Sequence, residues 1–212
     1  MAKLPALVDA VAAIDGRPRG AIDHVARAVR EAGLIQTTKR GRGASDMTAT
    51  DAAYLLIGLY GSDQPAHAAK AATEFGNALR LPFFPGVDTL PDAEVDTLRR
   101  AESLVDAVAA LIELGGRLRP GSLISRPGTE AGVDVLERSE TSGYAALFTL
   151  EREGAISTAT LAMPASTGFR VLERHFVVTK NTKPFEAPPV EVTVKLNTDV
   201  FIALHRALFP PA

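Results

Sequence analysis

The stretch from Ile22 to Leu56 constrains the fold more than any other part of this sequence, because it predicts two helices separated by a short basic segment. Apolar residues recur at helical spacing in the first helix, which gives it one face to bury; these are Ile22, Val25, Ala26 and Val29. Gly33 follows at the position where a glycine ends a helix. Thr48 and Asp51 form an acidic variant of the capping box, which predicts the start of the second helix before an apolar run.

The segment between these helices combines β-prone residues with positive charge. Residues 34–38 read Leu-Ile-Gln-Thr-Thr, a run typical of a short strand, and residues 39–43 read Lys-Arg-Gly-Arg-Gly. The pattern predicts a hairpin with cations at its tip. In the preceding helix, His24, Arg27 and Arg30 fall outside the apolar face. That helix can therefore pack by one side and still present cations to a partner.

The order of these features resembles that of MarR-like and related winged-helix bacterial regulators, over residues 22–56. In that family a recognition helix ends in a Gly-Leu-Ile or Gly-Leu-Val turn, and an arginine- and glycine-rich wing follows. A Leu/Met-Thr-x-x-Asp/Gly sequence then opens the next helix, as residues 47–51 do here. The resemblance implies base-edge contacts from the helix of residues 22–32. It implies phosphate or minor-groove contacts from Lys39, Arg40 and Arg42.

Other cations extend this predicted DNA-binding surface. Arg27 and Arg30 lie three residues apart on one helix, so both can face one groove and either can reach a guanine edge. His24 is one turn earlier, and the loop before the helix carries two arginines that we expect near phosphates. The predicted DNA-binding residues are Arg17, Arg19, His24, Arg27, Arg30, Lys39, Arg40 and Arg42.

The charge distribution is compatible with such a surface. The whole chain has a formal net charge of −2, but residues 1–45 hold eight Lys or Arg against four Asp or Glu, giving +4 and leaving −6 elsewhere. A phosphate backbone responds to local charge, so an acidic body with a basic head can bind DNA. The alternative is that these cations only solvate a small helical head.

The rest of the first half is predicted to be helical. Residues 4–14, 48–60 and 65–81 each carry apolar residues at helical spacing. A longer helix is predicted from about residue 92 to residue 114, between Pro91 and Gly115-Gly116. Its apolar stripe is equally consistent with pairing between two copies of the chain and with packing inside one copy.

The second half changes from helical periodicity to alternation. Residues 144–151, 156–163, 169–179 and 190–196 predict an antiparallel meander, and a last helix follows from Asn197 or Thr198 to Phe209. The predicted fold class is therefore α+β. Its parts are a winged-helix-like DNA-binding head (1–82), a long connecting or oligomerisation helix (91–116) and an α+β oligomerisation or effector domain (130–212).

Few residues suggest catalysis. The sequence has no cysteine, which excludes disulfides, thiolate metal sites and cysteine nucleophiles, and its four histidines are scattered. No phosphate-binding Gly-Lys-Ser/Thr loop and no Gly-x-Ser-x-Gly motif occurs. Polar residues in or near the predicted strands could converge, but we interpret them as the solvated side of a sheet; they are Glu137, Glu140, Glu151, Glu153, Glu173 and His175. We expect neither an enzyme nor a metal or cofactor.

The sequence lacks a signal peptide and a membrane-length apolar run, so we expect a soluble, cytoplasmic protein. The function that the pattern favours is a sequence-specific, duplex-DNA-binding transcription regulator of bacterial, phage or mobile-element origin, acting as a homodimer or higher oligomer. Two alternatives stay open. One is a phage packaging or assembly component, and the other is a protein-binding module whose basic head contacts acidic surfaces.

Overall fold

The computed structural model describes residues 2–36, 45–81, 88–90, 93–120, 124–125, 134–135, 144–151, 156–164, 169–177 and 193–210. Its α-helices are α1 (Leu4–Asp15), α2 (Arg19–Glu31), α3 (Ala49–Tyr60), α4 (Ala68–Gly76), α5 (Asp96–Arg100), α6 (Leu104–Glu113) and α7 (Thr198–Leu208). Short 3-10 helices are η2 (Pro65–His67), η3 (Ala93–Val95) and η4 (Leu114–Arg117). The strands are β1 (Leu79–Arg80), β2 (Ile124–Ser125), β3 (Asp134–Val135), β4 (Ala145–Glu151), β5 (Ile156–Pro164), β6 (Phe169–Val177) and β7 (Thr193–Asn197).

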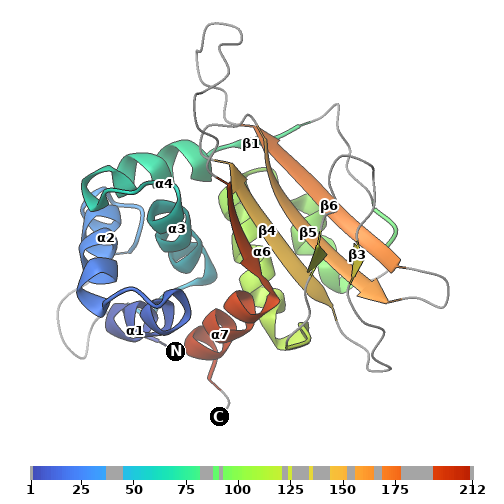
Figure 1. Cartoon of the computed structure of the whole chain (residues 1–212), viewed down its shortest axis with the longest axis horizontal. Helices are drawn as coiled ribbons and strands as arrows, with labels where there is room; N and C mark the ends of the chain where they lie inside the picture. The colour runs from blue at the N-terminus through green and yellow to red at the C-terminus, as the bar shows by residue number, and fades with distance from the viewer. Residues whose placement is uncertain are drawn as a thin grey trace, which may run out of the picture.

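The main sheet has the order β1-β6-β5-β4-β7, and every neighbouring pair is antiparallel. The predicted meander is confirmed for β4, β5 and β6, and β7 returns to pair with β4. The short strand β1 comes from the helical first half of the chain and pairs with β6, an addition that the sequence did not indicate. The mixed helical and antiparallel architecture confirms the predicted α+β class (Figure 1).

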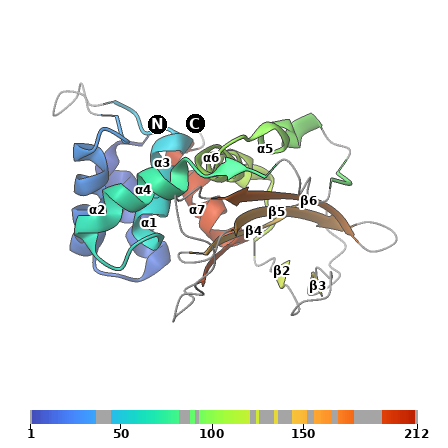
Figure 2. The ribbon, with the colours of Figure 1, turned by 90° about the horizontal axis from the view of Figure 1, so that it is seen from above.

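Helices cover one face of this sheet. Figure 2 shows α5 and α6 on one side of the strands and the β2–β3 pair on the other. The register places Phe148, Ala159 and Arg174 side by side across β4, β5 and β6. Phe148 and Ala159 are fully buried, so this row belongs to the face that packs on the helices.

The helix α6 lies at the centre of the fold and contacts α3, α4, α7 and β5. Its buried residues are Leu104, Val105, Ala107, Val108, Ala109, Ala110, Leu111 and Ile112. The apolar stripe that the sequence assigned either to a second copy or to the same chain therefore packs within the chain. Among the described residues, one hydrophobic cluster extends from α1 to α7, and α1 contacts α7 directly.

The predicted continuous helix over residues 91–116 is wrong. α5 ends at Arg100, and α6 begins at Leu104 after Ser103, whose hydroxyl accepts a hydrogen bond from the Asp106 N–H. The intervening backbone has other partners: Arg80 N–H donates to the Glu102 carbonyl at 2.8 Å and Leu104 N–H donates to the Ala78 carbonyl at 2.9 Å. Pairing with the end of β1 thus replaces a helical turn at this point.

The predicted helix ends around residues 32–48 are confirmed. Gly33 has φ of +77°, and the bonds Gly33 N–H to Arg30 O and Leu34 N–H to Val29 O complete a Schellman motif after α2. Thr48 and Asp51 form the capping box of α3. The described part of the predicted wing strand, residues 34–36, is not a strand. The Leu34 N–H is used in the Schellman motif that ends α2, and the Ile35 side chain is buried in the core. The remainder of the predicted wing lies outside the described residues.

Candidate functional site

The helix α2 presents part of the predicted DNA-binding set at the surface. Its predicted apolar face is buried as expected. On its other sides, His24 and Arg27 are exposed, while Arg30 is half-buried. The helix therefore docks by one face and leaves two of its three predicted base-contacting side chains directly accessible.

The turn before α2 holds Arg17 in a local network. The Arg17 guanidinium donates to Asp15, with Nη2 to Oδ1 at 2.8 Å, and the Tyr60 hydroxyl donates to the same carboxylate at 2.8 Å. Arg17 also lies over the Tyr60 ring, 5.5 Å from its centroid. The Arg17 hydrogen bond holds the pKa of Asp15 below its ordinary value, whereas burial raises the pKa of Tyr60. The network ties the α1–α2 turn to the end of α3.

Arg19 is also paired within the chain, with Asp9 of α1, at 2.5 Å between Nε and Oδ1. Both side chains are about half exposed, at 52% and 58%. Exposed ion pairs of this kind contribute little to stability, so a phosphate could replace the aspartate at small cost. Arg17 is held more firmly, because the side chain of its partner Asp15 is only 7% exposed.

The outward face of α2 is not uniformly basic. Asp23, Arg27 and Glu31 follow one another at a spacing of four residues, and all three are exposed. Side chains four apart on a helix are neighbours, so Arg27 lies between two carboxylates. These three side chains together carry no excess of positive charge, so a DNA-binding surface that includes them would need cations from outside this row.

In the sequence, the nearest group of further cations is the basic segment of residues 37–44. Lys39, Arg40 and Arg42 lie outside the described residues, but the two ends of their segment are tied together by Asp51. This buried carboxylate accepts hydrogen bonds from the Gln36 N–H at 3.0 Å and from the Thr48 N–H and hydroxyl, both at 2.8 Å. The described residues on either side of the basic segment, Gln36 and Thr48, are therefore held close together by one side chain.

A carboxylate–imidazole pair lies on the opposite face of the sheet from the helices. Glu173 Oε1 is 2.8 Å from His175 Nε2, and the Thr160 hydroxyl is 3.4 Å from Glu173 Oε2. Glu173 and Thr160 are buried and His175 is half-buried. The sequence placed both Glu173 and His175 on a solvated side, which is wrong for Glu173. Glu137, Glu140 and Glu153 lie outside the described residues.

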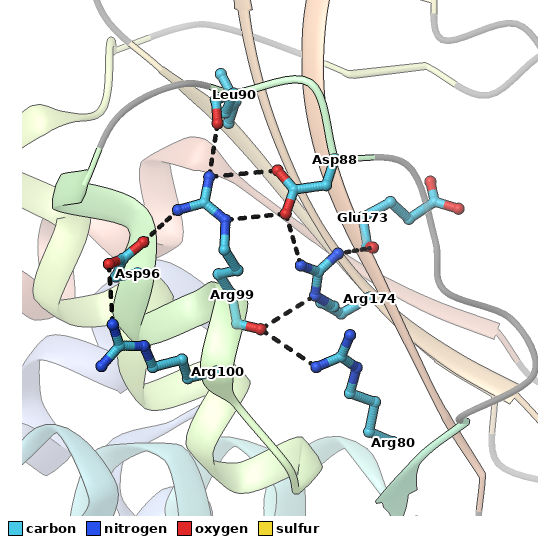
Figure 3. Close-up of polar contacts among 8 residues, drawn as sticks. All are labelled: Arg80, Asp88, Leu90, Asp96, Arg99, Arg100, Glu173 and Arg174. Atoms are coloured by element: carbon cyan, nitrogen blue, oxygen red, sulfur yellow. Dashed lines mark hydrogen bonds and ion pairs between the residues drawn. The ribbon is translucent and has the colours of Figure 1, made fainter.

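A cluster of arginines and aspartates joins β6, α5 and the segment of residues 88–90 (Figure 3). Its members are Arg80, Asp88, Asp96, Arg99, Arg100 and Arg174. The buried Arg174 donates from Nη2 to Asp88 at 2.9 Å, from Nη1 to the Glu173 carbonyl at 3.0 Å and from Nε to the Arg99 carbonyl at 3.3 Å. A buried guanidinium needs such partners to offset its lost hydration.

The same cluster continues outward along α5. Asp88 also accepts from Arg99, with Nε at 2.9 Å, and Arg99 in turn contacts Asp96, which binds Arg100 at 3.3 Å. The hydrogen bonds from Arg99 and then Arg174 keep the pKa of Asp88 below its ordinary value. Burial lowers the pKa of Arg174, and the nearby charges of Arg80 and Arg99 lower it further. Sequence reasoning missed this cluster, although Arg174 interrupts the apolar alternation of β6 at a position between Leu172 and Phe176.

The described residues contain no group of three or more His, Cys, Asp or Glu placed to hold a metal ion. None of the helices in the described ranges combines the length and hydropathy needed to cross a bilayer. Comparisons of the chain with family models, with curated proteins and with solved structures found no match.

Proposed function

We propose that the protein is a transcription regulator that binds duplex DNA in a sequence-specific manner through α2 and the basic segment of residues 37–44. The observation that carries the proposal is the pairing of α1 and α2 across a turn of three residues, Gly16 to Pro18, with φ of +78° at Gly16. A turn of this length containing glycine is typical of the helix-turn-helix unit, whose second helix enters the major groove.

In this arrangement α2 is the reading helix. Recognition helices contact base edges most often with their N-terminal residues. The exposed candidates on α2 lie further along the helix, with His24 near its middle and Arg27 one turn later. Arg30, nearer the end, is half-buried and suits a backbone contact. Asp51 holds the residues that flank the basic segment, Gln36 and Thr48, close together. In this proposal, the cations of the segment supply the positive charge that the outward face of α2 lacks.

A second candidate is a protein-binding module, and one observation favours it. The alternation of Asp23, Arg27 and Glu31 on the exposed face suits a partner surface that carries charges of both signs better than it suits a row of phosphates. The two candidates differ in salt dependence, because phosphate contacts release counterions and weaken steeply as salt rises.

The test is fluorescence polarisation with labelled duplexes, one from the region upstream of the gene and one of random sequence, at two salt concentrations. We expect salt-sensitive binding that persists better on the first duplex. Arg27→Ala should weaken it by about 1–3 kcal/mol if Arg27 reads a base. Lys70→Ala is the matched control, since it removes one charge from a side chain that is 75% exposed on α4. Absence of binding at low salt would exclude the DNA proposal and favour the protein-binding module.

A further inference from the structure

The ion pair between Arg19 and Asp9 lies where α1 meets the start of α2. Arg19 is the first residue of α2, and its Nε is 2.5 Å from Oδ1 of Asp9, which lies in the middle of α1. Within the described part of the chain, Asp9 is the hydrogen-bond partner of the Arg19 side chain, and Asp23, one turn later on α2, adds a weaker electrostatic effect. The cation at the N-terminus of α2 is therefore neutralised by a carboxylate of the preceding helix.

This pair can open more easily than the neighbouring pair of Arg17. The Arg19 and Asp9 side chains are 52% and 58% exposed, and ion pairs between exposed side chains contribute little to stability. The partner of Arg17, by contrast, is Asp15, whose side chain is 7% exposed and also accepts a hydrogen bond from the Tyr60 hydroxyl. Arg19 is thus the cation of this turn that can change partners without a change in the fold.

We propose that Asp9 is a built-in competitor of the DNA backbone: it occupies Arg19 in the free protein and releases it when a phosphate takes its place. The inference rests on the proposed function, in which α1 crosses the backbone as the first helix of a helix-turn-helix unit does. A phosphate at the start of α2 would meet the Arg19 guanidinium and the backbone N–H groups of the first turn, which the N-cap residue Pro18 cannot cap. Asp9 opposes this contact by holding the guanidinium and by its own negative charge. It therefore lowers the affinity for any duplex.

The first experiment compares Asp9→Asn with the wild type in the polarisation assay, on the upstream and the random duplex at low salt. Freeing Arg19 for one more phosphate should tighten binding about threefold or more. Phosphate contacts carry no sequence information, so both duplexes should gain by the same factor. Damage to the fold would weaken binding, so a gain cannot come from a structural defect.

The control is Glu113→Gln, which removes one charge from an exposed side chain on α6 and should change the affinity less. Equal affinities of Asp9→Asn and Glu113→Gln would overturn the proposal. A gain confined to one of the two duplexes would also overturn it, because the contact would then read sequence.

A double-mutant cycle separates competition for Arg19 from the simple removal of a negative charge near DNA. Competition requires the guanidinium, so Asp9→Asn should raise the affinity more in the wild type than in Arg19→Gln, where it relieves only the repulsion between Asp9 and the phosphates. Equal gains in the two backgrounds would show that Asp9 acts by its charge alone, and the proposal would fail.

The salt dependence gives a further readout and distinguishes this inference from the proposed function. One more phosphate contact releases more counterions, so from about 50 to about 200 mM salt the affinity of Asp9→Asn should fall about threefold more than that of the wild type. Identical salt slopes would contradict the added contact. If neither the wild type nor Asp9→Asn binds at low salt, the DNA-binding proposal fails and this inference fails with it. If the wild type binds and Asp9→Asn gains no more than Glu113→Gln, only the competition by Asp9 is refuted.

Discussion

Replacing Asp51 by alanine should destabilise the protein and loosen the base of the basic segment at the same time. The residue Asp51 is only 3% exposed. Its carboxylate accepts three hydrogen bonds, from the Gln36 N–H and from the Thr48 N–H and hydroxyl. It is also the N3 member of the α3 capping box. One truncation therefore removes a helix cap and leaves two backbone donors without their acceptor.

The size of the effect follows from these contacts. Loss of a helix cap costs about 1 kcal/mol, and a buried donor left without an acceptor costs about 1–3 kcal/mol. Because water can reach one of the two donors once the side chain is gone, we expect Asp51→Ala to lower the free energy of unfolding by about 3 kcal/mol. Thr48→Ala removes only one acceptor of the box and should cost about 1 kcal/mol.

Urea denaturation followed by circular dichroism measures both values. Asp46→Ala is the matched control, since Asp46 lies between the basic segment and α3 but forms a surface ion pair with Lys3, with side chains 43% and 42% exposed. Such pairs contribute about 0–1 kcal/mol. If Asp51→Ala cost no more than Asp46→Ala, the carboxylate would not be the anchor described here. At temperatures where the variant is folded, its DNA affinity should fall several-fold while that of Asp46→Ala does not.

Two further predictions concern packing and pH. Gly115→Ala should lower the free energy of unfolding by about 2–3 kcal/mol, because a Cβ there would lie 2.4 Å from the His205 Cβ and 2.6 Å from the Phe201 carbonyl oxygen. Gly20→Ala, with nothing within 4 Å, should be neutral or stabilising in the same denaturation assay, and equal losses would contradict the helix contact. The depressed pKa of Asp15 means that its contribution to stability is complete above the ordinary value of 3.8 and is lost as pH falls through the lower folded-state pKa. Asp15→Asn should therefore flatten the acid side of a Tm–pH profile, and an unchanged profile would contradict the Arg17 contact.

The elements that local patterns specify were predicted from the sequence. The helix α2 with Gly33 after it and the α3 capping box of Thr48 and Asp51 depend on residues within a few positions of one another. The strands β4, β5 and β6 follow from alternation, which needs only that one side of each strand be buried. The exposed positions of His24 and Arg27 follow from the same helical periodicity.

Contacts between distant segments decided the rest. Periodicity continues through residues 101–103, but hydrogen bonds to the end of β1 end the helix there. Arg17 and Arg19 form a run of cations in the sequence, and only the folded chain brings Asp9 and the shared Asp15–Tyr60 contact to them. Arg174 stands 86 residues from Asp88, so its burial as a paired charge is invisible to any local pattern. Local periodicity reports which side of an element is buried, whereas the partner of a charge depends on chain segments that meet only after folding.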